Sequence, residues 1–216
     1  DAARRPWLLG LFAGGWQRMS ALGGLLWHRA RRRAQNQRET SFEVVRFADH
    51  RGLEVVGLLN RAFPEEGSAE VPLVLIVPGF GGRKETFSAL AGTLVDNFRR
   101  QHQDVAVLRI DCTDNLGESE CAPGNAAEGR RNLAFTTSGQ VADITAALAW
   151  ARTNGKLTPS RIVLITSSFG SVAGRVALTR PECADVSLWV SYMDAADAQD
   201  SILQVAGHVD IVGNHR

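Results

Sequence analysis

Cysteine and histidine are scarce in this chain, whose 216 residues include only three cysteines and five histidines. An odd number of cysteines offers no disulfide framework, so we expect a reducing, cytoplasmic environment. Cys112, Cys121 and Cys183 do not have the spacing of a zinc site, and no histidine lies near them in the sequence. We therefore expect no bound metal, and the sequence calls for no nucleotide or flavin cofactor.

An excess of positive charge is missing from most of the chain. The net charge is +1, but residues 1–38 contain eight arginines and one acidic residue, so the remaining residues carry about −6. A domain with that balance lacks the basic surface that nucleic acids require, so we predict no nucleic-acid partner. The apolar content and the regular glycine and proline residues are typical of a globular domain.

Residues 1–38 differ in character from the rest, because residues 7–27 contain no acidic residue and their apolar side chains share one arc of a helix. Three interpretations remain open: a helix on an anionic membrane surface, a helix packed on the domain or a partner protein, and a transmembrane span. A span would bury Arg18 at a cost of about 3 kcal/mol. We expect residues 1–38 to be a basic amphipathic helical segment whose residues 7–33 contact a membrane surface or a partner protein. The apolar arc comprises Leu8, Phe12, Trp16, Met19, Leu22 and Leu26.

From Val71 onward, strand patterns alternate with helical patterns. This alternation predicts a mostly parallel, doubly wound sheet covered on both faces, and the pattern before it predicts an antiparallel hairpin. We expect this α/β domain to occupy residues 39–216, with the polar loop 112–132 outside its core. The expected strands span 41–47, 53–61, 71–78, 104–111, 161–165 and 186–192, and the expected helices span 85–100, 137–154, 172–178 and 195–205.

Helical periodicity selects the buried side of two of these helices. Leu148 and Trp150 lie on the apolar face of the helix at 137–154, so we expect both to be core residues. On the helix at 85–100, the shared apolar side comprises Phe87, Leu90, Leu94 and Phe98.

The clearest functional signal lies in residues 161–178. A strand pattern and a helical pattern are separated there by only six residues, so the chain must turn sharply. Such a turn needs small residues two positions before and two positions after its apex. Of the three serines in the turn, Ser168 alone meets this condition, with Thr166 and Gly170 as its neighbours. Ser168 would stand at the carboxyl end of the sheet beside a helix N-terminus, as in a nucleophile elbow.

The order of motifs around Ser168 resembles that of the α/β-hydrolase family, over about residues 41–205. The resemblance implies the α/β-hydrolase fold, and we expect the C-terminal part of that fold to be missing. Within the family, the sequence is similar to the acyl-transferases (fatty acyl-ACP thioesterases) of bacterial bioluminescence operons and, nearly as closely, to cinnamoyl-esterase-like hydrolases. The matching stretches are Gly79-Phe80 with Arg83, residues 109–111, 116–119 and 135–139, and the elbow.

The resemblance also implies roles at the site. Ser168 would attack an acyl carbonyl once a histidine has removed its proton. The N–H groups of Phe80 and Phe169 would bind the resulting oxyanion. The loop glycines, which let the backbone approach the substrate, are Gly79, Gly81 and Gly82.

Two positions depart from the family pattern, because Pro78 replaces a usual histidine and Thr166 replaces a usual glycine. The family places its catalytic acid and histidine after two further strands. Asp194 is the candidate acid in this chain, and His208 and His215 are the only histidines after the elbow. The alternative acids are Asp197, Asp200 and Asp210.

Two functions remain open. The favoured one is a serine hydrolase or acyl transferase that cleaves an ester or thioester of fatty-acyl type through a serine nucleophile and a backbone oxyanion hole. The alternative is a non-catalytic subunit with a hydrolase fold that serves in binding or assembly. We expect Asp111 and Ser119 to shape their loop in either case.

Overall fold

The computed structural model describes residues 42–63, 70–123 and 134–192. The helical segment expected at residues 1–38 lies outside the described residues. The expected helix at 195–205, Asp194 and both C-terminal histidines also lie outside them. Within the described ranges, no helix has the length and apolar character needed to cross a membrane.

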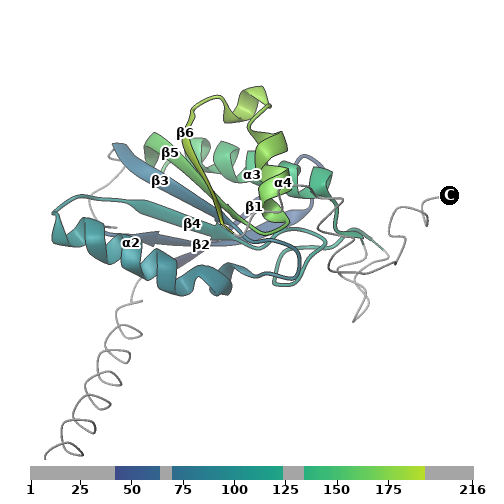
Figure 1. Cartoon of the computed structure of the whole chain (residues 1–216), viewed down its shortest axis with the longest axis horizontal. Helices are drawn as coiled ribbons and strands as arrows, with labels where there is room; N and C mark the ends of the chain where they lie inside the picture. Colours follow the sequence, from purple (N-terminus) through teal and green to yellow (C-terminus); the bar gives the residue numbers. More distant parts are fainter. Residues whose placement is uncertain (1–41, 64–69, 124–133, 193–216) are drawn as a thin grey trace, which may run out of the picture. The chain divides into compact units, whose positions relative to one another are not determined.

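Six strands form one mixed sheet in the order β1-β2-β4-β3-β5-β6 (Figure 1). β1 and β2 form the predicted hairpin, and β2 pairs antiparallel with β4. β4, β3, β5 and β6 are mutually parallel, so their carboxyl ends meet at one edge of the sheet. The strands are β1 (Phe42–Ala48), β2 (Glu54–Arg61), β3 (Glu70–Val77), β4 (Ala106–Ile110), β5 (Thr158–Ser167) and β6 (Val186–Tyr192).

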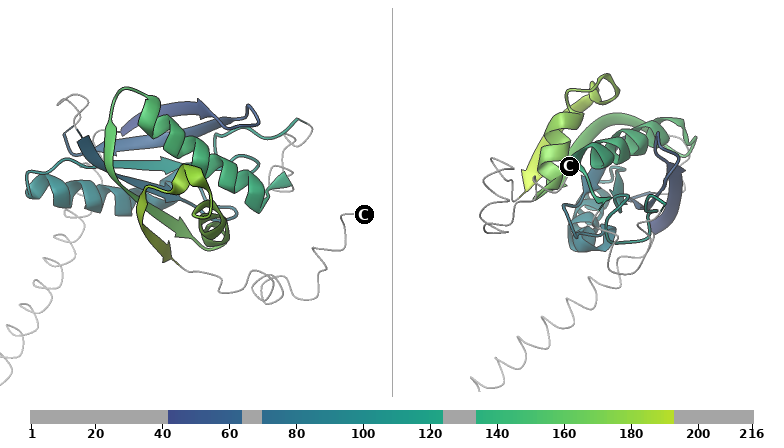
Figure 2. Two further views of the ribbon diagram at one scale, coloured as in Figure 1. Left: turned by 90° about the horizontal axis from the view of Figure 1, so that it is seen from above. Right: turned by 90° about the vertical axis from the view of Figure 1, so that its right-hand side faces the viewer.

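Helices cover both faces of this sheet (Figure 2). Successive residues of a strand point to opposite faces. Leu73 and Leu75 of β3 therefore join the larger core cluster with α3 and α4, whereas Val74 and Ile76 join the smaller cluster with α2. The helical elements are η1 (Lys84–Phe87), α2 (Ser88–Arg100), α3 (Thr137–Thr153), α4 (Gly170–Ala177) and η3 (Pro181–Cys183).

The buried side of α2 was predicted only in part. Phe87, Leu94 and Phe98 pack on the smaller cluster, but Leu90 is 36% exposed and the fully buried α2 residues are Ala91 and Val95. The element begins with the 3-10 turn η1, which has three residues per turn rather than 3.6. Inside α2 itself, Ala91, Leu94, Val95 and Phe98 have the i, i+3, i+4, i+7 spacing of one helix face, and Leu90 lies at the edge of that face.

The prediction for α3 is confirmed for Leu148, which is fully buried, but Trp150 is only partly buried. Trp150 stacks on Phe47 of the edge strand β1, with ring centroids 5.5 Å apart. It lies at the rim of the larger cluster because β1 ends the sheet on that side.

The expectation that residues 112–132 lie outside the core is wrong for the first part of that loop. Its buried residues are polar and hydrogen-bonded rather than apolar, so hydropathy alone misplaced them. They include Thr113, Asp114, Asn115 and Ser119, together with Cys112.

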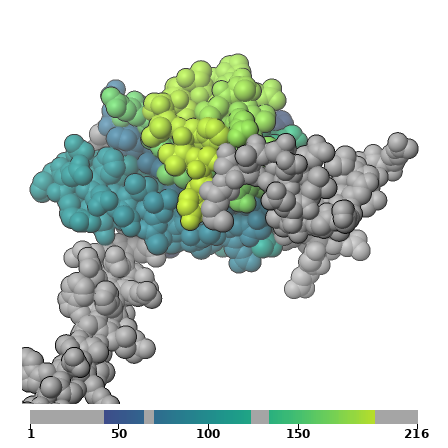
Figure 3. All heavy atoms as spheres, viewed as in Figure 1, coloured from purple at the N-terminus to yellow at the C-terminus, as the bar shows by residue number. Residues whose placement is uncertain are grey.

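β6 is the other edge of the described sheet. Its side chains Leu188, Val190 and Tyr192 share one face, and all three are exposed. Figure 3 shows the strand at the molecular surface beside α2. The exposed apolar face of β6 therefore lies next to the end of β5, where the sharp turn to α4 begins.

Candidate functional site

Ser168 occupies a strained turn between β5, which ends at Ser167, and α4, which begins at Gly170. Its φ of 50° lies in the left-handed region, which costs a non-glycine residue about 1–2 kcal/mol. The Ser168 N–H donates to the Tyr192 carbonyl oxygen at 2.8 Å, which ties the turn to the end of β6. Strain of this kind concentrates at functional sites.

The three serines of the turn have different environments. Ser168 is exposed, whereas Ser167 and Ser171 are 9% and 0% exposed. The Ser167 hydroxyl accepts a hydrogen bond from the Gly79 N–H at 3.2 Å, and the Ser171 hydroxyl bonds with Ser191. Among these three, Ser168 is the serine whose hydroxyl is open to a substrate.

Small residues allow the backbones around Ser168 to approach closely. A Cβ on Gly79 would lie 2.7 Å from the Ser167 carbonyl oxygen and 3.2 Å from the Phe169 nitrogen. A Cβ on Gly170 would lie 2.9 Å from the Pro78 carbonyl oxygen. The loop after β3 is therefore pressed against the turn after β5.

Thr166, which stands where the family usually has glycine, is accommodated by a glycine elsewhere. A Cβ on Gly174 of α4 would lie only 2.8 Å from the Thr166 Cγ2 atom. The Thr166 hydroxyl is also used, because it accepts a hydrogen bond from the Trp189 indole N–H at 2.9 Å. The close approach of strand and helix that the turn requires is therefore made possible by a small residue on the helix, Gly174, rather than on the strand.

The loop Gly79–Gly82 is held by a side chain from the loop after β4. The Asn115 amide donates to the Gly79 carbonyl oxygen at 3.1 Å, and its carbonyl oxygen accepts from the Gly81 N–H at 2.9 Å. Gly81 has a φ of 71°, which suits glycine, and the Gly82 N–H donates back to the Gly79 carbonyl oxygen. Sequence reasoning missed Asn115, because an isolated asparagine in a polar loop carries no distinguishing signal.

The N–H groups of Phe80 and Phe169 remain available at this junction. Within the described residues, neither of them donates a hydrogen bond. Phe169 stands at the N-cap of α4, where backbone N–H groups favour negative charge. Phe80 follows Gly79 directly, at the point where the β3 loop meets the turn. The structure thus brings together Ser168, Phe80, Phe169 and the three loop glycines that the sequence selected.

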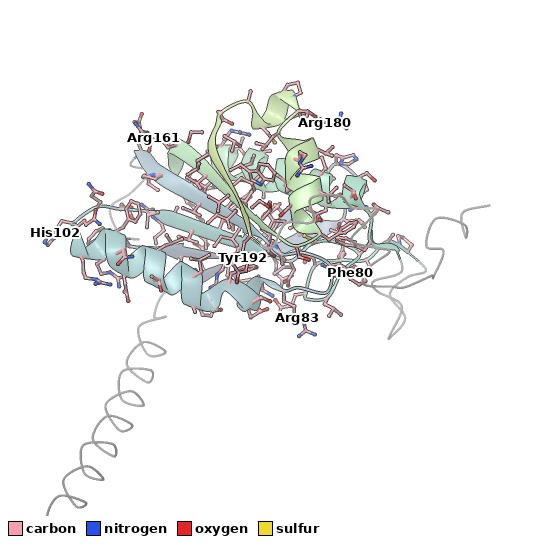
Figure 4. The ribbon with its side chains drawn as sticks, viewed as in Figure 1. Phe80, Arg83, His102, Arg161, Arg180 and Tyr192 are labelled. Atoms are coloured by element: carbon pink, nitrogen blue, oxygen red, sulfur yellow. The ribbon has the colours of Figure 1, made fainter. Side chains whose placement is uncertain are left out.

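Aromatic rings flank these N–H groups. The Phe135 ring contacts the Phe80 ring edge-on with centroids 5.4 Å apart, and it contacts the Phe169 ring at 5.9 Å. Phe80 is 56% exposed and labelled in Figure 4, where Arg83 and Tyr192 also lie near the carboxyl ends of the strands. The approach to Ser168 is therefore apolar and aromatic.

A buried ion pair supports the base of the same loop. The Lys84 ammonium lies 2.7 Å from the Asp111 carboxylate, and both side chains are almost fully buried. Burial alone would lower the pKa of Lys84, but hydrogen bonds with Asp111, Glu85 and Glu118 raise it above its ordinary value. The Glu118 N–H also donates to Asp111, and a Cβ on Gly117 would lie 2.3 Å from that carboxylate. This arrangement fits the loop-shaping role expected of Asp111.

A second ionic cluster lies between the hairpin turn, the β4 loop and α3. Arg51 pairs with Asp49 at 2.6 Å and with Asp114 at 3.3 Å, and it lies 3.9 Å from Asp143. Burial raises the pKa of Asp143 to about 7, against hydrogen bonds from Thr113 and the charge of Arg51, which lower it. No group of His, Cys, Asp and Glu side chains within the described ranges has the arrangement of a metal site.

The described histidines do not complete a catalytic pair. His102 lies at the far end of α2 from Arg83 (Figure 4), and His50 lies in the turn of the β1–β2 hairpin. Neither forms a hydrogen bond with Ser168 in the part of the chain that the structure describes.

Comparison with known protein families and with curated proteins finds no match. Solved structures do match. An alpha/beta hydrolase, GrgF from Penicillium sp. sh18, has a TM-score of 0.55 at 22% identity, over 78% of this chain and 53% of its own. An esterase from Pyrococcus furiosus has a TM-score of 0.51 at 12% identity, over 71% and 52%. An epoxide hydrolase from Vigna radiata has a TM-score of 0.50 at 16% identity, over 71% and 40%.

The matched part of this chain thus corresponds to about half of each of these structures or less. These matches, together with the strand order and the helix layers described above, identify the fold. The chain has the α/β-hydrolase fold.

Proposed function

We propose that Ser168 is the nucleophile of a serine hydrolase or acyl transferase that acts on an ester or thioester. The observation that carries this proposal is the exposed Ser168 at a φ of 50°, at the apex of the turn from β5 to α4. His102 and Asp114 also have a positive φ, but Ser168 combines it with an exposed hydroxyl at a sharp turn from strand to helix, as a nucleophile elbow requires.

In the proposed reaction, a base removes the Ser168 hydroxyl proton as the oxygen attacks the acyl carbonyl carbon. The tetrahedral oxyanion receives hydrogen bonds from the Phe80 and Phe169 N–H groups. As the intermediate collapses, its bond to the leaving oxygen or sulfur breaks, the protonated base gives its proton to that atom, and an alcohol or thiol departs and leaves the acyl group on Ser168. Water or an acceptor alcohol then releases that group by the same steps in reverse. No described histidine is hydrogen-bonded to Ser168, so we assign the base to none of the described residues.

The surroundings of Ser168 support an apolar acyl group. Phe80 exposes more than half of its surface, and Phe169 and Phe135 continue the aromatic wall. Tyr192 and Val190 extend an exposed apolar face along β6. Burying a hydrocarbon chain on such a surface stabilises a complex by about 0.8 kcal/mol per CH₂ group. We therefore propose a fatty-acyl ester or thioester as substrate.

A non-catalytic binding or assembly subunit is the second candidate. It is favoured by one observation, that no described histidine is hydrogen-bonded to Ser168. The two candidates differ in whether the complete gene product reacts at Ser168.

The decisive experiment is covalent labelling of the complete gene product with a fluorophosphonate, followed by peptide mapping and by hydrolysis of p-nitrophenyl esters of increasing acyl length. We expect labelling at Ser168, and a loss of at least about 10³-fold in kcat for Ser168→Ala. Ser138→Ala is the matched control, because Ser138 is also exposed and lies in the first turn of a helix. Labelling that persists in Ser168→Ala would move the nucleophile to another residue. A folded gene product that neither labels nor hydrolyses would establish the non-catalytic alternative.

A further inference from the structure

The ring of Phe135 lies between the side chains of the two residues whose N–H groups are proposed to bind the oxyanion. Its ring contacts the side chain of Phe80 on one side and that of Phe169 on the other, at centroid distances of 5.4 and 5.9 Å. Phe80 belongs to the loop after β3, and Phe169 follows the nucleophile in the turn after β5. One ring thus links two segments that are far apart in the sequence.

Phe135 is itself anchored. It is partly buried and packs on the larger core cluster. It directly precedes Thr136, the N-cap of α3, whose hydroxyl accepts a hydrogen bond from the Gly139 N–H at 3.0 Å. The exposed Phe80 ring, by contrast, stands on a loop whose backbone is hydrogen-bonded to Asn115 at Gly79 and Gly81, and the contact with Phe135 adds a restraint on Phe80 itself.

We infer that Phe135 is a positioning residue that aligns the Phe80 and Phe169 N–H groups for the oxyanion. This inference rests on the proposed function of Ser168. Edge-to-face and tilted contacts fix the orientation of a ring as well as its position. Because each contacted ring belongs to a residue that supplies one donor, fixing both rings restricts the backbone of both donors. An oxyanion hole depends on donors that are already in place when the charge develops.

A positioning role predicts a specific kinetic signature. Phe135→Leu keeps apolar bulk but removes the aromatic contacts, so kcat falls roughly 10–100-fold while KM for a short ester stays unchanged. The loss is the same for acetate and for long-chain esters, because the oxyanion is common to all of them. Phe135→Tyr keeps the ring and retains most of the activity. Binding of a trifluoromethyl ketone, which mimics the oxyanion, weakens in Phe135→Leu in parallel with the fall in kcat/KM.

The test measures these quantities in the complete gene product, with rates divided by the number of active sites that a fluorophosphonate titrates. Phe47→Leu is the matched control, because Phe47 is another partly buried phenylalanine on the same cluster and lies away from Ser168. It lowers stability and leaves kcat per titrated site unchanged.

Each other outcome overturns the inference in a recognisable way. A loss that grows with acyl length, with kcat for the acetate ester unchanged, makes Phe135 a substrate contact instead. An equal loss of kcat in Phe47→Leu reduces Phe135 to general packing. In both cases the proposed function of Ser168 stands. A parent protein that neither hydrolyses esters nor labels removes the proposed function and this inference together.

Discussion

The turn around Ser168 and the loop after β4 meet at the same edge of the sheet, but different forces shape them. The turn depends on missing side chains, because Gly79, Gly170 and Gly174 each leave room where a Cβ would come within 2.9 Å of a neighbouring atom. The loop depends on buried polar groups, chiefly Asp111 and Asn115, each of which is 0% exposed.

Because of this difference, the turn and the loop each hold a different part of the proposed site in place. The steric turn restricts the backbone at Ser168 and Phe169, because the loop after β3 is packed closely against it. The polar loop holds the Gly79–Gly82 segment, which contains Phe80, through hydrogen bonds with Asn115. The two donors of the proposed oxyanion hole thus belong to segments held by different forces, and Phe135 contacts the side chains of both donor residues. Perturbing each region separately tests this division.

The largest expected effect belongs to the polar loop. Lys84→Met leaves the buried Asp111 carboxylate without its cation, and we expect the free energy of unfolding to fall by about 3–5 kcal/mol. Chemical denaturation measures the change. Lys156→Met is the control, because Lys156 pairs with Glu43 at an exposed site and should cost less than about 1 kcal/mol. Equal effects of the two variants would show that the buried pair is not what holds the loop.

The second expected effect is that the free energy of unfolding depends on pH because of Asp143. Its folded pKa of about 7 lies above its unfolded value near 4, so the folded state holds the proton more tightly. Protonated Asp143 therefore adds to the free energy of unfolding. This contribution is complete below about pH 4 and is lost as the pH rises through 7. The surrounding charges, Arg51, Asp49 and Asp114, are the same in an Asp143→Asn variant.

The measurement is therefore the difference in unfolding free energy between the parent and Asp143→Asn across this range. We expect the parent to lose about 3–4 kcal/mol relative to the variant between pH 4 and pH 8. Asp185→Asn is the control, because Asp185 forms an exposed ion pair with Arg152. The difference in unfolding free energy between the parent and this variant gives the pH dependence expected of an exposed carboxylate. A difference that stays constant with pH would mean that Asp143 is ionised throughout.

The smallest effect probes the steric turn with two glycine-to-alanine changes in helices. Gly174→Ala should destabilise the protein by about 1–3 kcal/mol, because its Cβ would lie 2.8 Å from Thr166. Gly92→Ala in α2 has no atom within 4 Å of its Cβ and should stabilise by up to about 1 kcal/mol. Thermal unfolding of both variants gives the contrast.

A double variant sharpens this test. Thr166→Ser removes the Cγ2 atom but keeps the hydroxyl that bonds to Trp189. The double variant Thr166→Ser/Gly174→Ala should therefore have a free energy of unfolding at least about 0.5 kcal/mol higher than the sum of the two single effects predicts. Strict additivity of the two changes would contradict the proposed exchange of a small residue between the strand and the helix.

Much of the fold could be predicted because its signals are local. Every strand in the described ranges was expected, although β5 spans Thr158–Ser167 rather than only 161–165, and Ser168 was distinguished from Ser167 and Ser171 by its neighbours alone. The errors occurred where context overrides pattern. Leu90 was misplaced because the buried face of α2 is centred on Ala91 and Val95, and Trp150 because its helix face reaches the rim of the sheet.

The sequence by itself determined the order of the elements and the identity of the exposed serine, because strand periodicity and turn sterics act within about ten residues. Only the tertiary structure decided what holds the site together. Lys84 and Asp111 are 27 positions apart, and Gly81 and Asn115 are 34 apart. Phe135 meets Phe80 and Phe169 only after three segments have converged on one edge of the sheet. Polar and aromatic residues accept many partners, so their choice follows from packing and leaves no pattern in the chain.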